Sequence, residues 1–304
     1  MARPCPARPV SQMAEVATLA GTARPRRKKS PLRPIIAHTL LVIASIAMLY
    51  PLLWMLAAAF RPQDEIFATT SIIPSSISFD AFVRGWNGLQ VSFGTFFVNS
   101  FVISVLCVIG NIFACSVTAY AFARLKFWGK GFWFALMLGT LMLPYQVTLI
   151  PQYVLFHDIG WVNTFLPLVV PKYLATDSFF IFLMVQFFRG IPRELDEAAA
   201  IDGCNSFQIY WKVMLPLSTP VLVTAAIFTF IFTWDDFFGP LIYLNDMKNY
   251  TVTLALRSFV DSTAQSDYGG LFAMSILALV PIFLFFLFFQ RLLIEGIATT
   301  GMKR

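Results

Sequence analysis

Side chains with catalytic or metal-binding chemistry are few in this sequence. Its two histidines, His38 and His157, stand far apart with no cysteine or carboxylate at ligand spacing, so no metal site is expected. Cys107 and Cys115 share one apolar run, which suggests small buried side chains instead of a disulfide framework. Glycine-rich phosphate loops and the GxSxG and HExxH elements of hydrolases do not occur in the sequence. No motif supports an enzyme, and we expect no cofactor in this chain.

Charged residues inside apolar runs are the other candidates: Lys172 and Asp177 in one run, and Asp235 and Asp236 in another. Ionisable groups within a membrane are costly and commonly face a cavity or a partner. Asp177 is placed about 15 Å from the inner end of its run, which makes it the deepest charge and the preferred pathway residue. Asp235 lies about 28 Å of helix rise beyond Pro216, near the outer surface, where solvation at a helix end is an equally good explanation.

Composition places these residues in a lipid bilayer. The chain is 58% hydrophobic and only 12% charged, whereas a soluble domain carries about 25% charged residues. The sequence therefore predicts an all-α integral membrane protein with six transmembrane helices, the third and fourth of them interrupted by prolines. The six runs are roughly 35–59, 97–121, 132–155, 165–187, 216–239 and 271–290.

The distribution of basic residues predicts the orientation of these helices. The run from Ile35 to Phe60 is too long for the apolar region of a secretory signal, so it is expected to be an uncleaved first span. Residues 1–34 are then a basic, disordered cytoplasmic tail and 35–304 a transmembrane domain. Most of the 22 lysines and arginines fall on one side, which predicts that both termini and the loop between the fourth and fifth runs are cytoplasmic. These dispersed charges indicate orientation and not nucleic-acid binding.

A short acidic, alanine-rich segment, DEAAAIDG, lies in that cytoplasmic loop. Pro192 suits a first helical turn and Gly203 a helix end, which predicts a helix of about nine residues and about 13 Å, too short to cross a membrane. Its expected face is built mainly of small side chains: Leu195, Ala198, Ala199 and Asp202. Such a face partitions weakly into lipid but lets another surface approach closely, so docking into a protein groove is the better interpretation.

A second short helix is expected directly after this segment. Asn205 or Ser206 is its expected cap. One stripe would carry Phe207, Tyr210, Trp211 and Met214. This aromatic stripe favours a helix that rests on the membrane surface.

The run EAAAIDGCNSFQIYWKVMLPLSTP, residues 197–220, resembles the EAA loop of the permease subunits of binding-protein-dependent ABC importers. The stretches FFRGIPRELDEAA and FTFIFTWDDFFGPLI resemble the carbohydrate-uptake branch, and in particular the smaller of its two permease types. The likeness extends from about Leu40 to the closing GIATTGMKR. The positions that match the EAA pattern are Glu197, Ala198, Ala199, Asp202, Gly203, Leu215 and Pro216.

The resemblance implies a non-catalytic subunit of the bacterial inner membrane. It would pair with a second permease and with two ATPase subunits that bind ATP and Mg²⁺, and an extracytoplasmic binding protein would deliver the solute. The EAA helix would couple ATPase closure to the spans, with Glu197 facing a basic group of the ATPase, Ala198 and Ala199 permitting close packing and Gly203 making the turn.

For substrate contact, the resemblance implies a sugar or sugar derivative. Asp177, Tyr173 and Ser178 would hydrogen-bond its hydroxyls, whereas Asp235 replaces the family's usual asparagine. The polar outer loop with Asp246, Lys248, Asn249 and Tyr250 would face the binding protein. The alternatives are an ion-coupled secondary transporter, which should show an internal repeat, and a membrane enzyme, which should show a catalytic constellation.

Overall fold

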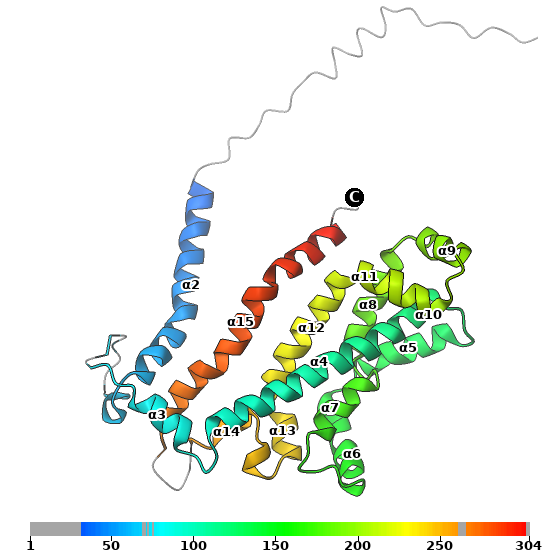
Figure 1. Ribbon diagram of the computed structural model, residues 1–304. Coiled ribbons are helices and arrows are strands. Elements are labelled where there is room, and N and C mark those ends of the chain that lie inside the picture. Colours follow the sequence, from blue (N-terminus) through cyan, green and yellow to red (C-terminus); the bar gives the residue numbers. More distant parts are fainter. Residues whose placement is uncertain (1–31, 69–70, 72, 75, 261–265, 302–304) are drawn as a thin grey trace, which may run out of the picture. The chain divides into compact units, whose positions relative to one another are not determined.

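A computed structural model describes residues 32–68, 71, 73–74, 76–260 and 266–301 of the 304-residue chain. The described residues form helices joined by short turns, without a strand (Figure 1). Residues 1–31 of the predicted tail lie outside the described residues. The helices in order are α2 (Leu32–Ala59), η1 (Gln63–Glu65), α3 (Asp80–Asn87), α4 (Phe93–Arg124), α5 (Lys130–Thr140), α6 (Tyr145–Asp158), α7 (Leu166–Tyr173), α8 (Ser178–Gly190), α9 (Glu194–Ile201), α10 (Ser206–Ile209), η2 (Tyr210–Met214), α11 (Leu215–Leu217), α12 (Thr219–Trp234), α13 (Phe238–Tyr243), η3 (Met247–Asn249), α14 (Val252–Arg257) and α15 (Tyr268–Gly301).

The chain divides into two compact units, Met1–Leu52 and Leu53–Arg304. Where it is described, the first unit is the amino-terminal part of α2, an almost wholly apolar helix whose side chains from Ile35 to Leu52 are exposed. In the second unit α4 is central, because it packs against α7, α8 and α12, while α12 packs against α15 and α15 against α3. Within this unit α9 and the carboxyl end of α15 lie at one end, and α6, α13 and α14 at the other (Figure 1).

Four helical segments among the described residues are long and apolar enough to cross a membrane: Ile35–Ala59, Phe93–Arg124, Leu166–Gly190 and Tyr268–Gln290. Two further segments are bent pairs, and the total rises to six if each pair counts as one span. The expected third run is α5 and α6, bent by 99°, and the fifth is the segment from α10 to α12, bent by 77°.

Prolines account for both bends. Pro144 directly precedes α6, and the residue before a proline is pushed out of the helical region, so α5 cannot continue into α6 as a straight helix. The second bend lies at Ser218, between Ser206–Leu217 and Thr219–Trp234, and the prolines on either side of it, Pro216 and Pro220, lack the N–H that a continuous helix would use. The widened π-turn η2, in which Leu215 donates its N–H to Tyr210 O, lies in the first of these two halves. The interruption that the sequence indicated in the third run is therefore a bend, and the fifth run, for which no interruption was expected, is bent as well.

The core of the second unit lies along α4. One apolar cluster joins Cys115 and Ala119 of α4 with Met184 and Phe188 of α8 and with Met214. A second cluster joins the start of α4 to α12, α14 and α15. Between them, Asn111 Nδ2 donates to Thr229 Oγ1 at 2.7 Å, a fully buried hydrogen bond between α4 and α12. Interhelical hydrogen bonds of this kind fix the register of packed membrane helices.

Candidate functional site

The acidic, alanine-rich segment forms α9, an eight-residue helix. It ends in a Schellman arrangement, because Cys204 donates its N–H to Ala199 O and Gly203 to Ala200 O, each at 3.0 Å. Gly203 has φ +84°, the left-handed conformation that glycine adopts without strain. The backbone geometry thus explains why the sequence has a glycine at the end of this helix.

The side chains of α9 divide into an inner and an outer set. Ala199 packs against the core, so it is not part of the exposed face on which the sequence placed it. Glu197, Ala198 and Asp202 are exposed. Ile201, which sequence reasoning did not single out, is 87% exposed and adds a large apolar side chain to this outer face. Its position four residues after Glu197 was the signal available.

The second short helix is held to α4 by polar contacts. Asn205 and Gln208 form a reciprocal capping box at the start of α10. Tyr210 shares a 2.8 Å hydrogen bond with Ser116, and both Tyr210 and Met214 are buried. The aromatic stripe expected to rest on a membrane surface is therefore split. Only two of its four members, Phe207 and Trp211, are exposed.

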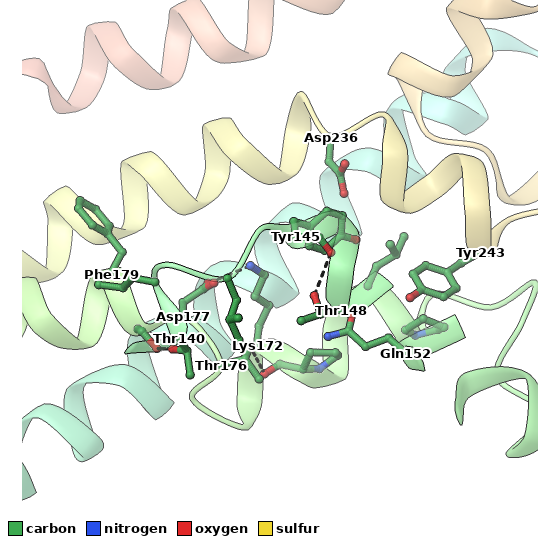
Figure 2. Close-up of a pocket in the computed structure, with 16 residues that line it drawn as sticks. Thr140, Tyr145, Thr148, Gln152, Lys172, Thr176, Asp177, Phe179, Asp236 and Tyr243 are labelled. Atoms are coloured by element: carbon green, nitrogen blue, oxygen red, sulfur yellow. Dashed lines mark hydrogen bonds and ion pairs between the residues drawn. The ribbon is translucent and has the colours of Figure 1, made fainter. Parts of the chain in front are cut away.

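A cavity of about 540 Å³ lies at the other functional region, between α5, α6 and the α7–α8 junction (Figure 2). Lys172 Nζ donates a 2.8 Å hydrogen bond to Asp177 Oδ2 within it, so this ammonium and this carboxylate neutralise one another. Its lining is rich in groups that hydrogen-bond: Thr140, Tyr145, Thr148, Gln152, Lys172, Thr176, Asp177, Ser178, Asp236 and Tyr243.

Of the residues predicted to line the substrate pathway on the fourth run, two line the cavity and one does not. Asp177 and Ser178 line the cavity, and Ser178 Oγ shares a 2.7 Å hydrogen bond with Thr140. Tyr173 is not among the lining residues. Its ring lies over Gly110 of α4, so close that a Cβ there would be 2.4 Å from it.

The carboxylate contributed by the fifth run is Asp236 and not Asp235. Asp235 is exposed and does not line the cavity, whereas Asp236 does and also accepts a hydrogen bond from Gly239 N at 3.2 Å. The sequence also missed Tyr145, Thr148 and Gln152 of α6. Their spacing of three and then four residues places them on one helical face, which was the signal available.

Comparison with known families decides what kind of protein contains these two regions. Residues 110–299, which include α9 and every residue that lines the cavity, match the family described as "Binding-protein-dependent transport system inner membrane component". The chain belongs to this family. It is the permease of an ABC importer, a membrane component distinct from the catalytic subunits.

Relatives cover most of the permease. It is 37% identical over 258 residues to the probable ABC transporter permease protein YurM of Bacillus subtilis, covering 85% of each chain. It is 32% identical to the arabinooligosaccharides transport system permease protein AraQ of Halalkalibacterium halodurans, covering 91% of this chain and 99% of the relative. A crystal structure of a bacterial ABC transporter involved in the import of the acidic polysaccharide alginate contains a chain with TM-score 0.78 and 22% identity, covering 88% of this chain and 99% of that one.

The loop from Asp246 to Tyr250, which is predicted from the sequence to face outward, is ordered by Asn163, which lies in the turn between α6 and α7 at φ +63°. Its Oδ1 accepts hydrogen bonds from Asn245 N and Asp246 N, at 3.0 and 2.9 Å, and its carbonyl accepts one from Asn249 Nδ2 at 2.9 Å. On the other side, Asn99 Nδ2 donates to the carbonyls of Lys248 and Tyr250, at 2.8 and 3.0 Å. The loop from Asp246 to Tyr250 is therefore held in place by its backbone, while Asp246 and Lys248 remain exposed.

Proposed function

We propose that this permease carries a sugar or oligosaccharide, delivered by an extracytoplasmic binding protein, across a bacterial inner membrane. The observation that carries the proposal is the hydroxyl-rich cavity beside α7 and α8, whose lysine is already paired with a carboxylate. Such a lining offers many hydrogen bonds to a neutral polyol. The AraQ relative, which this chain matches almost from end to end, is named for arabinooligosaccharide transport.

The proposed assembly contains a second permease subunit and two ATPase subunits, which bind the ATP and Mg²⁺ that this chain does not. In it the permease has six spans, with each bent pair counted once, and both termini are cytoplasmic. The positive-inside bias supports this orientation. It places α9 on the ATPase side and the outer loop, with Asp246, Lys248, Asn249 and Tyr250, on the side of the binding protein.

In this assembly α9 is the coupling helix. Glu197, Ala198 and Ile201 form an outer face that combines a carboxylate, a small side chain and a large apolar one. A helix with an apolar anchor and an acidic rim suits a groove with basic edges. After α9 the chain turns at Asp202 and Gly203, and this turn sets the direction in which it leaves the groove. Pro216, the last position of the EAA pattern, comes after α10 and η2.

The first experiment is purification of the tagged chain from its own membranes in mild detergent, with the accompanying proteins identified by mass spectrometry. An ATPase and a second permease are expected. A homo-oligomer without an ATPase would overturn the importer assignment and direct attention to ion-coupled transport.

The pathway assignment has its own test, with a matched control. Asp177→Ala removes a carboxylate from the cavity and leaves Lys172 unpaired, so uptake by the reconstituted transporter is expected to fall about tenfold or more. Asp235→Ala removes a carboxylate that does not line the cavity and is expected to leave uptake within about twofold of the wild type. Equal uptake by the two variants would remove Asp177 from the pathway.

A further inference from the structure

Three side chains of α4 hold the cytoplasmic segment that contains α9, α10 and η2. Ser116, Tyr120 and Arg124 follow one another at intervals of four residues, so they share one face of α4. Ser116 bonds Tyr210 in η2, and Tyr120 Oη donates to Ser206 O in α10 at 3.0 Å. Arg124 is the member of this set that reaches α9.

Arg124 makes two contacts that fix the start of α9. Its Nε lies 3.0 Å from Asp196 Oδ2, and its Nη2 donates to Ile191 O at 2.7 Å. The side chains of Arg124 and Asp196 are only 5% and 19% exposed. Burial raises the pKa of Asp196 above its usual value, while Arg124 and Arg193 oppose the rise by favouring the carboxylate. Burying this charge is costly, which distinguishes the pair from an ordinary surface ion pair.

Other contacts between α9 and the rest of the permease are weak. The residue of α9 that packs against the apolar core is Ala199, whose side chain is a single methyl group. A methyl contact buries little area and does not resist rotation of the helix about its axis. The hydrogen bond from Arg124 to Ile191 O is directional and holds the chain entering α9, while the ion pair with Asp196 holds the first turn of α9 by charge attraction, without a hydrogen bond from Nε.

The other part of α4 lies against the cavity. Gly110 of α4 receives the ring of Tyr173, the last residue of α7. Cys115 Sγ approaches Asp177 O at 3.7 Å, at the junction of α7 and α8. One continuous helix thus contacts the elements that form the cavity and, through Arg124, the helix at the cytoplasmic end.

We propose that Arg124 and Asp196 form a charged joint that makes α9 and α4 move together, so that displacement of α9 by a partner reaches the cavity wall. The proposal rests on the proposed function, since it takes α9 to be the helix that an ATPase displaces. The joint transmits movement of α9 to α4, and it neither contacts the solute nor takes part in ATP hydrolysis. Its loss is expected to leave a transporter that assembles and hydrolyses ATP without moving solute.

The test uses the complete transporter with its ATPase and binding protein, reconstituted in vesicles. Asp196→Asn keeps the shape of the side chain but leaves Arg124 without a charged partner. We expect the ATPase to copurify in its normal ratio, uptake to fall at least about tenfold, and hydrolysis to lose its stimulation by the loaded binding protein. Lys126→Gln is the matched control, because it removes an exposed positive charge two residues from Arg124 and is expected to change uptake by less than about twofold.

A double variant separates a joint from a merely stabilising pair. Arg124→Met with Asp196→Leu removes both charges and fills their volume, and such replacements of buried pairs are commonly neutral for stability. The joint predicts an assembled complex with low uptake, because neither the ion pair nor the hydrogen bond of Arg124 remains. Wild-type uptake by the double variant or by Asp196→Asn would overturn the proposal, and so would loss of uptake that only follows loss of assembly. If the wild-type chain brings down no ATPase, the proposed function fails instead.

Discussion

Substitutions of Gly203 are expected to distinguish two causes of lost uptake: backbone strain in the turn after α9, and a side chain that blocks the surface on which a partner docks. Gly203 has φ +84°, and a Cβ added there would meet no heavy atom within 4 Å. Within the described part of the chain a Cβ at this position meets no steric penalty, only a backbone penalty. A loss of uptake that is larger for arginine than for alanine would therefore point to a surface beyond the turn itself.

The backbone penalty can be estimated from the conformation alone. An alanine in the left-handed region costs about 1–2 kcal/mol, a factor of about 5–30 in the equilibrium between the native turn and alternatives. Asparagine tolerates this region better than other residues with a side chain. We therefore expect Gly203→Asn to retain most uptake, Gly203→Ala to lose a part of it, and Gly203→Arg to abolish it because a long cationic side chain fills the approach to α9.

The assay is solute uptake by vesicles that contain the complete transporter, with copurification of the ATPase measured on the same preparations. Membrane insertion of Gly203→Arg is expected to be normal, since the residue lies in a cytoplasmic turn in the proposed topology. Normal uptake by Gly203→Arg would refute docking at α9. Equal losses for alanine and arginine would mean that strain alone explains the position.

Three further substitutions test the packing described above. Gly110→Ala is expected to displace the ring of Tyr173 and to lower the melting temperature in detergent by an amount equivalent to about 1–3 kcal/mol, and unchanged melting would contradict the close contact. Thr229→Val keeps the shape but leaves the buried Asn111 amide without its acceptor, at a cost of about 1 kcal/mol, which the same thermal assay would detect as a smaller decrease. Asn163→Ala removes the oxygen that accepts hydrogen bonds from Asn245 N and Asp246 N and strains a residue at φ +63°, so proteolysis of the Asp246–Tyr250 loop should become faster, and an unchanged digestion rate would argue against the role of Asn163.

The helix α9 could be predicted from sequence because its signals are local. Acidic residues in the first turn and a glycine after the last turn act through the backbone of that helix alone, and its observed bounds, Glu194–Ile201, agree closely with those signals. The division of its side chains could not be predicted in this way. Ala199 faces inward because of where α4 and α8 lie, and that arrangement is set by contacts far apart in the sequence.

The cavity was predictable only in part. A charge inside an apolar run marks a polar environment, which is why Asp177 could be singled out. Asp235 and Asp236 are neighbours and carry the same group, so the choice between them depends on where the helix ends. Because α12 ends at Trp234, and not near residue 239 as the hydropathy indicated, Asp236 lies in the break before α13 and lines the cavity.

The bend at Pro144 explains why the α6 lining escaped prediction. Hydropathy showed a single run interrupted by prolines, but the angle between its halves depends on the turn that Leu141, Met142 and Leu143 form. Only after that turn does the polar face of α6 come beside α7. A proline indicates that a helix breaks, whereas the direction of the next helix is decided by packing.

The same bent pair has a consequence for how the cell must make this protein. None of the side chains of α5 is buried and only Phe156 of α6 is, and between them Met142 is 85% exposed at a break in the helix. Irregular backbone is not tolerated against lipid, so this arm requires a covering protein surface in the bilayer. In the proposed assembly the second permease subunit supplies that surface, so a copy synthesised without it would expose irregular backbone to lipid and become a target for proteolysis. The abundance of this chain in the cell is therefore expected to follow the supply of the second subunit, and deletion of that subunit's gene should deplete this chain too.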